Sequence, residues 1–297
     1  MEWLHQLQKA VDFMEAHLLE DISYEDVAHH VYMSGYSFHR TFSLMAGMTA
    51  NEYIRSRRLS LAAQELQQGT LSVLDAALKY GYETPESFAK AFSRFHSCTP
   101  KQARIKGTPL RMFNPLRIKI TLEGGRIMDY RIVKQESQRF LALIRPFPNE
   151  IINDDNDHSI PDFWGECHEK GLAEPLRKLR PEGKRDLYGL CSPKKDEHEC
   201  FSYGIGVIID EKTDVSNLHA LLMEHGYQIW ETEPAEYAVF KCIGEDGDCI
   251  SQAWSRFYRE FLPQSGYAQT ELTDYEIYFE QGEKGLFCEL WIPVEKA

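Results

Sequence analysis

The first hundred residues contain an internal repeat, which constrains the fold more than any other feature of the chain. At an offset of 49 residues, Ile22, Asp26 and Ala28 match Leu71, Asp75 and Ala77. After one extra turn residue the offset becomes 50, and the matches are Ser37, Phe38, Phe42, Ser43 and Thr49 with Ser87, Phe88, Phe92, Ser93 and Thr99. Each copy reads as a helix, a short glycine-containing turn and a second helix, which is the pattern of a helix-turn-helix unit.

Capping residues indicate where the helices begin and end. Ser23 followed by Asp26 predicts the start of one helix, and Thr49 followed by Glu52 predicts the start of a much longer one. Gly69 is the stop signal of the long helix, which therefore runs to about residue 68. At 1.5 Å per residue, this helix is a rigid connector about 30 Å long between the two copies.

The second helix of each copy has an apolar stripe and a polar face. Phe38, Phe42 and Met45 are spaced i, i+4, i+7 and must face the core, as must their counterparts in the second copy. The faces expected to point outward consist of Tyr36, His39, Arg40 and Ser43 in the first copy and Glu86, Ser87, Lys90 and Arg94 in the second. Two such helices on one rigid connector would lie about 34 Å apart, one turn of B-DNA, so one chain could enter two successive major grooves.

Six of these side chains are candidate contacts to DNA bases: Tyr36, His39, Arg40, Glu86, Ser87 and Lys90. Arg40 and Lys90 hold equivalent positions and are suited to guanine, whereas Glu86 can accept from cytosine N4. Glu86 has an alternative role, because Thr84 and Pro85 predict a helix start at which any carboxylate is stabilising. His39 is either a groove contact or an ordinary exposed histidine.

Basic residues on the connector and around the second copy are candidate contacts to DNA phosphates. They are Arg55, Arg57, Arg58, Arg94, Lys101 and Arg104. Phosphate contacts position a protein on the duplex without reading its sequence. Ordinary surface charge is the alternative reading for these side chains.

Several spaced motifs resemble one known family. They are Tyr53-Ile-Arg-Ser-Arg-Arg-Leu59, Ala76-Ala-Leu-Lys-Tyr-Gly-Tyr82, Glu86-Ser-Phe-Ala-Lys-Ala-Phe-Ser-Arg-Phe95 and Thr99-Pro100. Together they resemble the DNA-binding domain of the AraC/XylS family of bacterial transcription regulators, over roughly residues 5 to 106. The resemblance implies that the six candidate base contacts occupy base-contacting positions, and it leads us to expect an activator that works with RNA polymerase. Here the DNA-binding domain comes first, as in the Rob-like branch of the family, and His96-Ser97-Cys98 replaces the usual glycine-containing turn.

The net charge of −13 hides a division between the two parts of the chain. Residues 1 to 120 carry 14 Lys and Arg against 12 Asp and Glu, whereas residues 121 to 297 carry 19 against 34. Taken over the whole chain, the charge argues against a nucleic-acid binder, because phosphate contacts need clustered cations. When the net charge is counted separately for the two parts, it argues only that the second part does not bind DNA.

The second part changes to a strand-rich pattern. Residues 107 to 128 contain Pro109, Pro115 and Gly124-Gly125 and read as a linker that becomes a strand near residues 116 to 122. Beyond it, similar segments recur: 139–144 and 236–240, 160–164 and 250–254, and 201–203 and 287–289. The expected fold is multidomain, with an all-α double helix-turn-helix domain (1–106), the linker and first strand (107–128), and an α+β domain of two strand-helix-strand-strand modules (129–297).

Motifs in residues 129 to 297 resemble a second family. They are Phe163-Trp164, Phe201-Ser-Tyr-Gly-Ile-Gly206 and Phe287-Cys-Glu-Leu-Trp-Ile-Pro293, and they are similar to those of the GyrI-like effector-binding domains. The resemblance implies that a small molecule binds in a cleft between the two modules. The expected partners of the whole chain are therefore double-stranded promoter DNA, a small-molecule effector and RNA polymerase.

The last strand suggests the chemistry of that effector. If residues 286 to 293 alternate, Glu289 lies between the aromatic side chains of Phe287 and Trp291 on one face, which suits a lipophilic cation. Tyr203 holds the matching position of the first module and is expected to face Glu289 across the cleft. Trp164, Trp254, Tyr258, Tyr275 and Trp291 are further candidates for its lining. The alternative is that Glu289 lies on a solvent-facing surface and the aromatic residues are core.

Other classes of function are less well supported. A small-molecule hydrolase or a protein-protein interaction module is the alternative role of the second part, but no nucleophile-base pair or metal-ligand spacing stands out. We expect no catalytic residues, no cofactor and no metal. The scattered cysteines and the short apolar runs predict a cytoplasmic protein that does not associate with membranes.

Overall fold

The computed structural model describes residues 2–118, 129–151, 157–172, 176, 186–193, 200–210 and 226–297. They form two compact units, and the chain crosses between them more than once. Unit 1 consists of residues 1–33 and 46–122, and unit 2 consists of residues 34–45 and 123–297. The domain boundaries expected from the sequence differ from this division at residues 34–45, and as domain limits they stay a prediction.

Unit 1 is helical and contains both capping signals that the sequence predicted. Its helices are α1 (Glu2–Ala16), α2 (Tyr24–His30), α4 (Ala50–Gln68), α5 (Val73–Lys79), α6 (Pro85–His96) and α7 (Pro100–Ala103). Ser23 and Asp26 form a capping box at α2, and Thr49 and Glu52 form another at α4. Gly69 ends α4 in the left-handed conformation. The predicted start of α6 is also confirmed, since the Thr84 hydroxyl accepts from the Ser87 amide.

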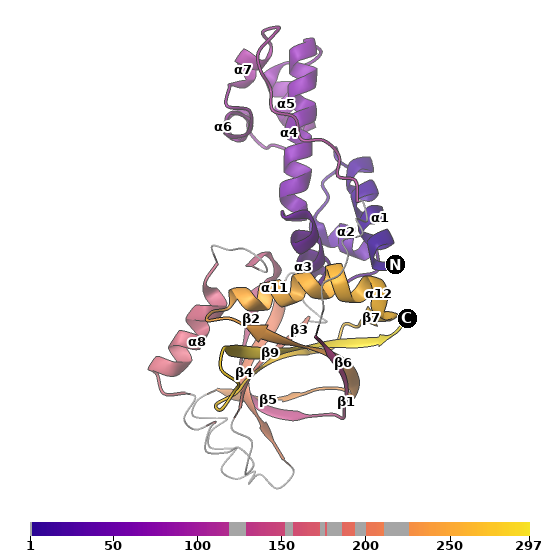
Figure 1. The fold of residues 1–297 in the computed structure, drawn as a ribbon. Helices are drawn as coiled ribbons and strands as arrows, with labels where there is room; N and C mark the ends of the chain where they lie inside the picture. The colour runs from indigo at the N-terminus through magenta and orange to yellow at the C-terminus, as the bar shows by residue number, and fades with distance from the viewer. Residues whose placement is uncertain are drawn as a thin grey trace. The chain divides into compact units, whose positions relative to one another are not determined.

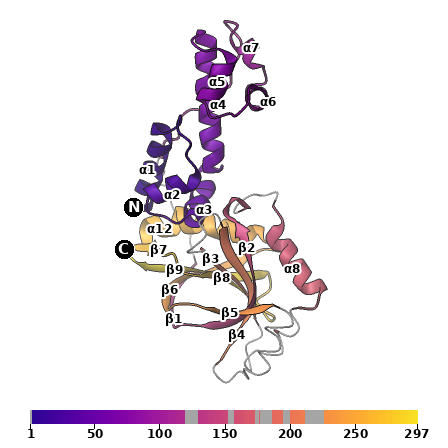
Figure 2. The ribbon, with the colours of Figure 1, turned by 180° about the vertical axis from the view of Figure 1, so that it is seen from behind.

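The long helix α4 organises this unit. Figure 1 and Figure 2 both show α5, α6 and α7 gathered around one end of α4. Leu59, Leu66, Phe88 and Phe92 lie in the shared core of these helices and are almost inaccessible to water. The apolar stripe predicted for the second copy therefore faces its core, as the i, i+4 spacing requires.

Two turns of unit 1 use left-handed backbone. Gly81 has φ +80°, and a Cβ added there would lie 3.0 Å from Nη1 of Arg58, so the position favours glycine on both grounds. Ser97 ends α6 with φ 60°, in place of the glycine that is usual in the family. Although residues 96–98 lack the glycine that the family usually has, the turn after α6 keeps the left-handed conformation that a glycine would adopt.

The first part of the predicted linker lies along unit 1. Residues 109–118 have no regular secondary structure. Side chains satisfy their amides: Phe113 donates to the Ser60 hydroxyl, Leu116 to the Tyr53 hydroxyl and Ile118 to Oε1 of Gln8. The strand expected near residues 116 to 122 is absent from residues 116–118, and the rest of that segment lies outside the described residues.

A charged network ties this segment to α1 and α4. Nε of Arg57 lies 2.7 Å from Oε1 of Glu15, and its Nη2 lies 2.9 Å from Oε2. The same guanidinium donates to the carbonyl of Phe113, and the Tyr53 hydroxyl donates to Glu15 at 2.7 Å. The Arg57 side chain is only 9% exposed. Hydrogen bonds to charged groups of this kind stabilise more than neutral ones.

The described residues of unit 2 form one antiparallel sheet with helices. Its helical segments are α3 (Gly35–Ala46), η1 (Asn149–Ile151), α8 (Ser159–Glu169), α11 (Asp248–Arg256), the π-helical turn η2 (Phe257–Phe261) and α12 (Leu262–Ser265). Its strands are β1 (Arg131–Gln135), β2 (Arg139–Pro148), β3 (Leu187–Pro193), β4 (Cys200–Ile209), β5 (Tyr227–Glu231), β6 (Ala235–Ile243), β7 (Tyr267–Gln269), β8 (Asp274–Tyr278) and β9 (Leu286–Lys296).

The strand order confirms the two predicted modules. The sheet runs β1-β6-β9-β8-β3-β4-β2-β5, with β7 beside β9. One module is β2, α8, β3 and β4, and the other is β6, α11, β8 and β9, so each follows the order strand-helix-strand-strand. Antiparallel pairing of β3 with β8 joins them at the centre of the sheet. The α+β architecture expected from the sequence is therefore confirmed.

The two faces of the sheet have different environments. The helix-covered face carries Phe240, which packs edge-on against Phe257, and Tyr203, which accepts a hydrogen bond from Trp164 of α8. The opposite face carries a second aromatic cluster that includes Tyr275 and Trp291. Figure 1 shows α11 and α12 running along the sheet. Strands β4 and β9 are buried on both sides over most of their length, which explains why they read as nearly continuous apolar runs.

Helix α3, the second helix of the first repeat, belongs to unit 2. Tyr36 lies in the same buried cluster as Leu141, Phe163 and Phe201, and its ring centroid is 5.1 Å from that of Phe201. The outward orientation expected for Tyr36, His39 and Ser43 is wrong, because all three are buried. The spacing of apolar residues predicts which face of a helix is buried, but it does not show whether other parts of the protein also cover the polar face.

Replacing Arg57 by Met is expected to lower the free energy of unfolding by about 2 to 3 kcal/mol, because Glu15 and the Phe113 carbonyl lose a buried charged donor. Urea unfolding followed by helical circular dichroism measures this loss. Arg55→Met on the exposed side of the same helix is the matched control and is expected to change stability by less than about 0.5 kcal/mol. Equal losses in the two variants would contradict the structural role of Arg57.

Candidate functional site

Two carboxylates of β8 lie on the helix-covered face of the sheet. Asp274 is opposite Cys191 of β3, and Glu276 is opposite Gly189. Residues two apart on a strand point to the same side and are separated by about 7 Å. Asp274 and Glu276 therefore form one continuous acidic strip, which we call the two-carboxylate site.

Aromatic side chains surround Glu276. The Tyr203 hydroxyl donates to Oε2 of Glu276 at 2.8 Å, and the Tyr278 hydroxyl donates to the same oxygen at 3.1 Å. Trp164 of α8 donates its indole N–H to the Tyr203 oxygen at 3.0 Å. A Cβ at Gly189 would collide with both the Tyr203 hydroxyl and the Glu276 carboxylate. Only glycine at this position lets the two groups meet.

The protein environment makes these carboxylates hard to ionise. Burial raises the pKa of Glu276 to about 7, although the hydroxyls of Tyr203 and Tyr278 oppose the change. Burial also raises the pKa of Asp274 to about 6, with Arg40 as the main opposing influence. Both a neighbouring cation and hydrogen-bond donors favour the ionised form of a buried acid. A cation beside either carboxylate would therefore lower its pKa.

Asp274 already has a cationic partner from α3. Nη1 of Arg40 lies 3.2 Å from Oδ2 of Asp274. The Tyr36 hydroxyl lies 2.8 Å from the Cys191 sulfur and donates to Asp274 at 3.3 Å. The Arg40 guanidinium carbon also lies 4.1 Å from the centroid of the Trp254 ring. A carboxylate and an aromatic face together hold this cation.

The structure divides the predicted effector-binding residues between the two faces of the sheet. Tyr203 and Trp164 contact each other on the helix-covered face, and Trp254 and Tyr258, from the helices, stack with ring centroids 5.9 Å apart. Tyr275, Glu289 and Trp291 lie on the opposite face, where Tyr275 pairs with Trp291 and Glu289 with Ile277. Glu289 instead binds Arg131, with Oε1 2.8 Å from Nη1. The expectation that Tyr203 and Glu289 face each other across a cleft is therefore wrong.

Tyr203 and Glu289 lie on opposite faces because the alignment of residues 201–203 with residues 287–289 is shifted by one residue. Alternation along β9 was predicted correctly, because Glu289 and Trp291 do share a face. The helix-covered face, however, takes Tyr203 from β4 and Leu290 from β9, the latter opposite Phe240. Equivalent residues of the two strands are therefore an odd number of positions apart, not 86. A slip of one residue moves every side chain to the other face.

Sequence reasoning missed Asp274 and Glu276. Their signal is the segment Asp274-Tyr-Glu-Ile-Tyr278, in which acidic residues alternate with apolar and aromatic ones. Alternation of this kind normally indicates a solvated strand face. Only the pairing of β8 between β9 and β3 at the sheet centre shows that both faces are buried.

The predicted DNA-reading residues differ between the two repeats. In α6, Glu86, Ser87, Lys90 and Arg94 are all exposed, as expected of a reading face. In α3, Tyr36 and His39 are each 3% exposed, and the Arg40 side chain is 11% exposed. Their assignment as base contacts stays a prediction for both helices.

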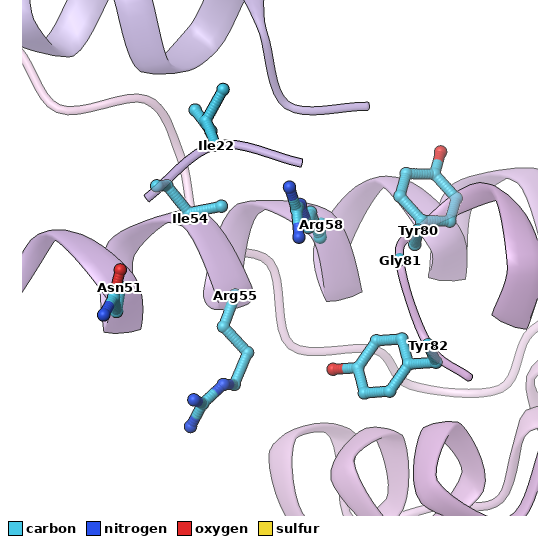
Figure 3. Close-up of a pocket in the computed structure, with 8 residues that line it drawn as sticks. All are labelled: Ile22, Asn51, Ile54, Arg55, Arg58, Tyr80, Gly81 and Tyr82. Atoms are coloured by element: carbon cyan, nitrogen blue, oxygen red, sulfur yellow. The ribbon is translucent and has the colours of Figure 1, made fainter. Parts of the chain in front are cut away.

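The candidate phosphate contacts also separate into two groups. Arg55, Arg94, Lys101 and Arg104 are exposed. Arg57 is bound to Glu15, and Arg58 donates to the backbone carbonyls of Leu18 and Glu20, so both have structural roles here. Figure 3 shows a pocket of unit 1 between α4 and the turn at Gly81, in which Tyr82 points toward Arg55. Of the three connector arginines, Arg55 is the exposed one, and its assignment as a phosphate contact stays a prediction.

Two further observations concern other kinds of site. Among the described residues, no helix is both long and apolar enough to cross a bilayer. Within the same residues, no group of three or more His, Cys, Asp or Glu side chains is arranged to hold a metal ion. The acidic segment at residues 154–157 has neither the glycine nor the downstream Glu that a calcium-binding loop requires, and it lies mostly outside the described residues.

The raised pKa of Glu276 predicts a pH dependence of stability. Between the ordinary pKa of 4.5 and the folded value of about 7, the folded state keeps a proton that the unfolded state releases. The free energy of unfolding is therefore expected to fall by about 1 to 3 kcal/mol as the pH rises through this range. Urea unfolding at pH 5 to 8 measures the slope, and Glu276→Gln should flatten it. An unchanged slope in this variant would contradict the assignment.

Comparison with known proteins identifies both parts of the chain. Residues 128–295 match the model of the GyrI-like small molecule binding domain, and residues 27–106 match that of a helix-turn-helix domain. The HTH-type transcriptional activator AarP of Providencia stuartii is 38% identical over 96 residues, which cover 32% of this chain and 71% of AarP. The transcriptional regulator Rob of Salmonella typhimurium is 24% identical over 300 residues, which cover 96% of each chain.

Among solved structures, that of SAV2435 bound to tetraphenylphosphonium aligns with 57% of this chain and 94% of that chain, at 19% identity and a TM-score of 0.46. The GyrI-like match alone spans more than half of the sequence. The chain therefore belongs to the GyrI-like family, and its N-terminal AraC-type helix-turn-helix domain makes it a DNA-binding transcription regulator with a small-molecule-binding domain.

Proposed function

We propose that the chain is a cytoplasmic transcription activator whose effector is a hydrophobic cation. The observation that carries this proposal is the two-carboxylate site, in which Glu276 lies among Trp164, Tyr203 and Tyr278. A lipophilic cation would combine charge pairing with contact to aromatic faces. The acidity of residues 121–297 favours the same class of ligand, since negative potential attracts cations.

Sensing rather than catalysis is the proposed role of this site. Burial raises the pKa of both Tyr203 and Tyr278 well above the ordinary value, so both phenols keep their protons at neutral pH. They donate those protons to Glu276 and are poor candidates for a general base. The groups around Glu276 are therefore suited to holding a ligand in place.

DNA reading is assigned to the exposed residues of α6 and, when α3 is accessible, to Tyr36, His39 and Arg40. In α6 the proposed base contacts are Glu86, Ser87 and Lys90, with Arg94, Lys101, Arg104 and Arg55 as phosphate contacts. RNA polymerase is the proposed partner in activation. All four phosphate candidates belong to unit 1, in which basic residues outnumber acidic ones.

A Lys90→Ala variant is expected to relax base preference at one position of the operator by about 1 to 3 kcal/mol. Lys101→Ala is the matched control, since it should weaken all sequences equally and lower the salt slope by about one. Fluorescence anisotropy on genomic fragments recovered with the full chain, and on their single-base variants, measures both effects. Uniform weakening by both variants would show that Lys90 is not a reading residue.

A Glu276→Gln variant is expected to bind tetraphenylphosphonium at least about tenfold more weakly, because it removes the carboxylate but keeps the shape of the side chain. Tryptophan fluorescence of the full chain measures binding, with triphenylphosphine oxide as the neutral probe. Glu289→Gln, on the opposite face of the sheet, is the control and should change the affinity by less than about twofold. Retained affinity in Glu276→Gln would overturn the proposed site.

A further inference from the structure

The first reading helix lies inside the effector-binding unit. Residues 34–45, which include most of α3, belong to the same compact unit as residues 123–297. Tyr36 is part of the buried cluster on the helix-covered face, together with Leu141, Phe163 and Tyr203. The helix is thus a component of the unit 2 core and not a surface attachment.

Arg40 makes the contacts that a bound cationic ligand would make. Its guanidinium carbon lies 4.4 Å from the centroid of the Tyr36 ring and 4.1 Å from that of Trp254. Nη1 forms a buried ion pair of 3.2 Å with Asp274, whose side chain is 6% exposed. Two aromatic faces and a buried carboxylate are the usual elements of a cation-binding cage.

A second set of contacts fixes the start of the helix. One carboxylate oxygen of Glu271 accepts from the Ser34 hydroxyl at 2.6 Å and from the Ser37 hydroxyl at 2.9 Å. The other accepts from the Ser34 amide at 3.3 Å. Glu271 is an exposed residue that lies outside the two-carboxylate site. It therefore contributes to helix docking without forming part of the proposed effector contacts.

Comparison with the second repeat shows which DNA-reading side chains are inaccessible while α3 is docked in unit 2. Lys90 is the counterpart of Arg40, and Glu86 is the counterpart of Tyr36 at the offset of 50. Both α6 residues are exposed, whereas Tyr36 is buried and the Arg40 side chain is only 11% exposed. A side chain cannot contact a base edge while it is buried in the protein. In this state only the second repeat presents its reading face.

We propose that α3 is an internal ligand of the two-carboxylate site, in which Arg40 occupies the place of a cationic effector. A hydrophobic cation competes with Arg40 for the carboxylates and for the Trp254 indole, and it thereby releases the helix for DNA binding. The inference rests on the proposed function, because it identifies how the effector at Glu276 acts. Asp274 and Glu276 are neighbours on one strand face, so a cation that reaches Glu276 lies beside the position of Arg40.

Thermodynamic linkage determines whether the cation raises or lowers the affinity for DNA. Operator DNA can contact both repeats only in the fraction of molecules in which α3 is undocked, so docking reduces the apparent affinity for the operator by that fraction. A cation that binds only the undocked state raises DNA affinity, and DNA raises cation affinity by the same factor. The effector then acts as an activator without contacting DNA.

The test uses a substitution that weakens docking and leaves both the reading residues and the two-carboxylate site unchanged. Glu271→Gln removes the charged acceptor of three hydrogen bonds to Ser34 and Ser37. In the full chain without any added cation, it is expected to bind operator DNA about five- to tenfold more tightly than the wild type. Fluorescence anisotropy at fixed salt measures the affinity.

Glu295→Gln is the matched control, because it removes one negative charge from the same unit at an exposed position of β9 that pairs with β7. If Glu271→Gln binds DNA no more tightly than Glu295→Gln, docking does not limit DNA binding and the proposal is overturned. This arm contains no cation, so its outcome is independent of the proposed effector.

A second arm adds tetraphenylphosphonium to the wild type and to Glu271→Gln. The cation is expected to raise the DNA affinity of the wild type and to have a smaller effect on Glu271→Gln, in which the helix is already released. A cation that binds by fluorescence but leaves DNA affinity unchanged would overturn the competition. A cation that does not bind at all would instead show that the proposed function is wrong, while the first arm still decides on docking.

Discussion

The cost of burying negative charge governs the architecture of unit 2. Asp274 and Glu276 stand on the central part of the sheet, where an isolated carboxylate would be strongly disfavoured. The structure meets that cost in two ways: phenol hydroxyls donate to Glu276, and Arg40 pairs with Asp274. Gly189, the aromatic residues of α8 and β4, and α3 are the parts of the structure that bring these partners to the two carboxylates.

Local signals in the sequence predicted much of this fold. The capping boxes at Ser23 and Thr49, the glycine stop at Gly69 and the two strand-helix-strand-strand modules all agree with the structure. These features depend on neighbouring residues, so a single sequence contains the required information. Alternation along β9 was also predicted correctly, since it depends only on the pleat of one strand.

The candidate site could not be predicted to the same degree, because it depends on contacts between distant segments. Whether Glu289 or Glu276 faces the helices is decided by strand register, which differs by one residue from the best match of the repeat. The partner of Arg40 is 234 residues away in the chain. The polar face of α3 has the composition of a solvated or DNA-reading surface, and no local pattern marks the aromatic residues that cover it.

The unequal exposure of α3 and α6 has a consequence for how such a regulator finds its operator. Non-specific binding to DNA needs only phosphate contacts and tolerates sliding and hopping along the duplex. If the exposed α6 surface and its cations contact phosphates as proposed, the chain keeps this search mode whether or not α3 is docked. Under the same proposal, the second repeat would hold the protein on DNA and the release of α3 in the first repeat would determine when it binds its operator.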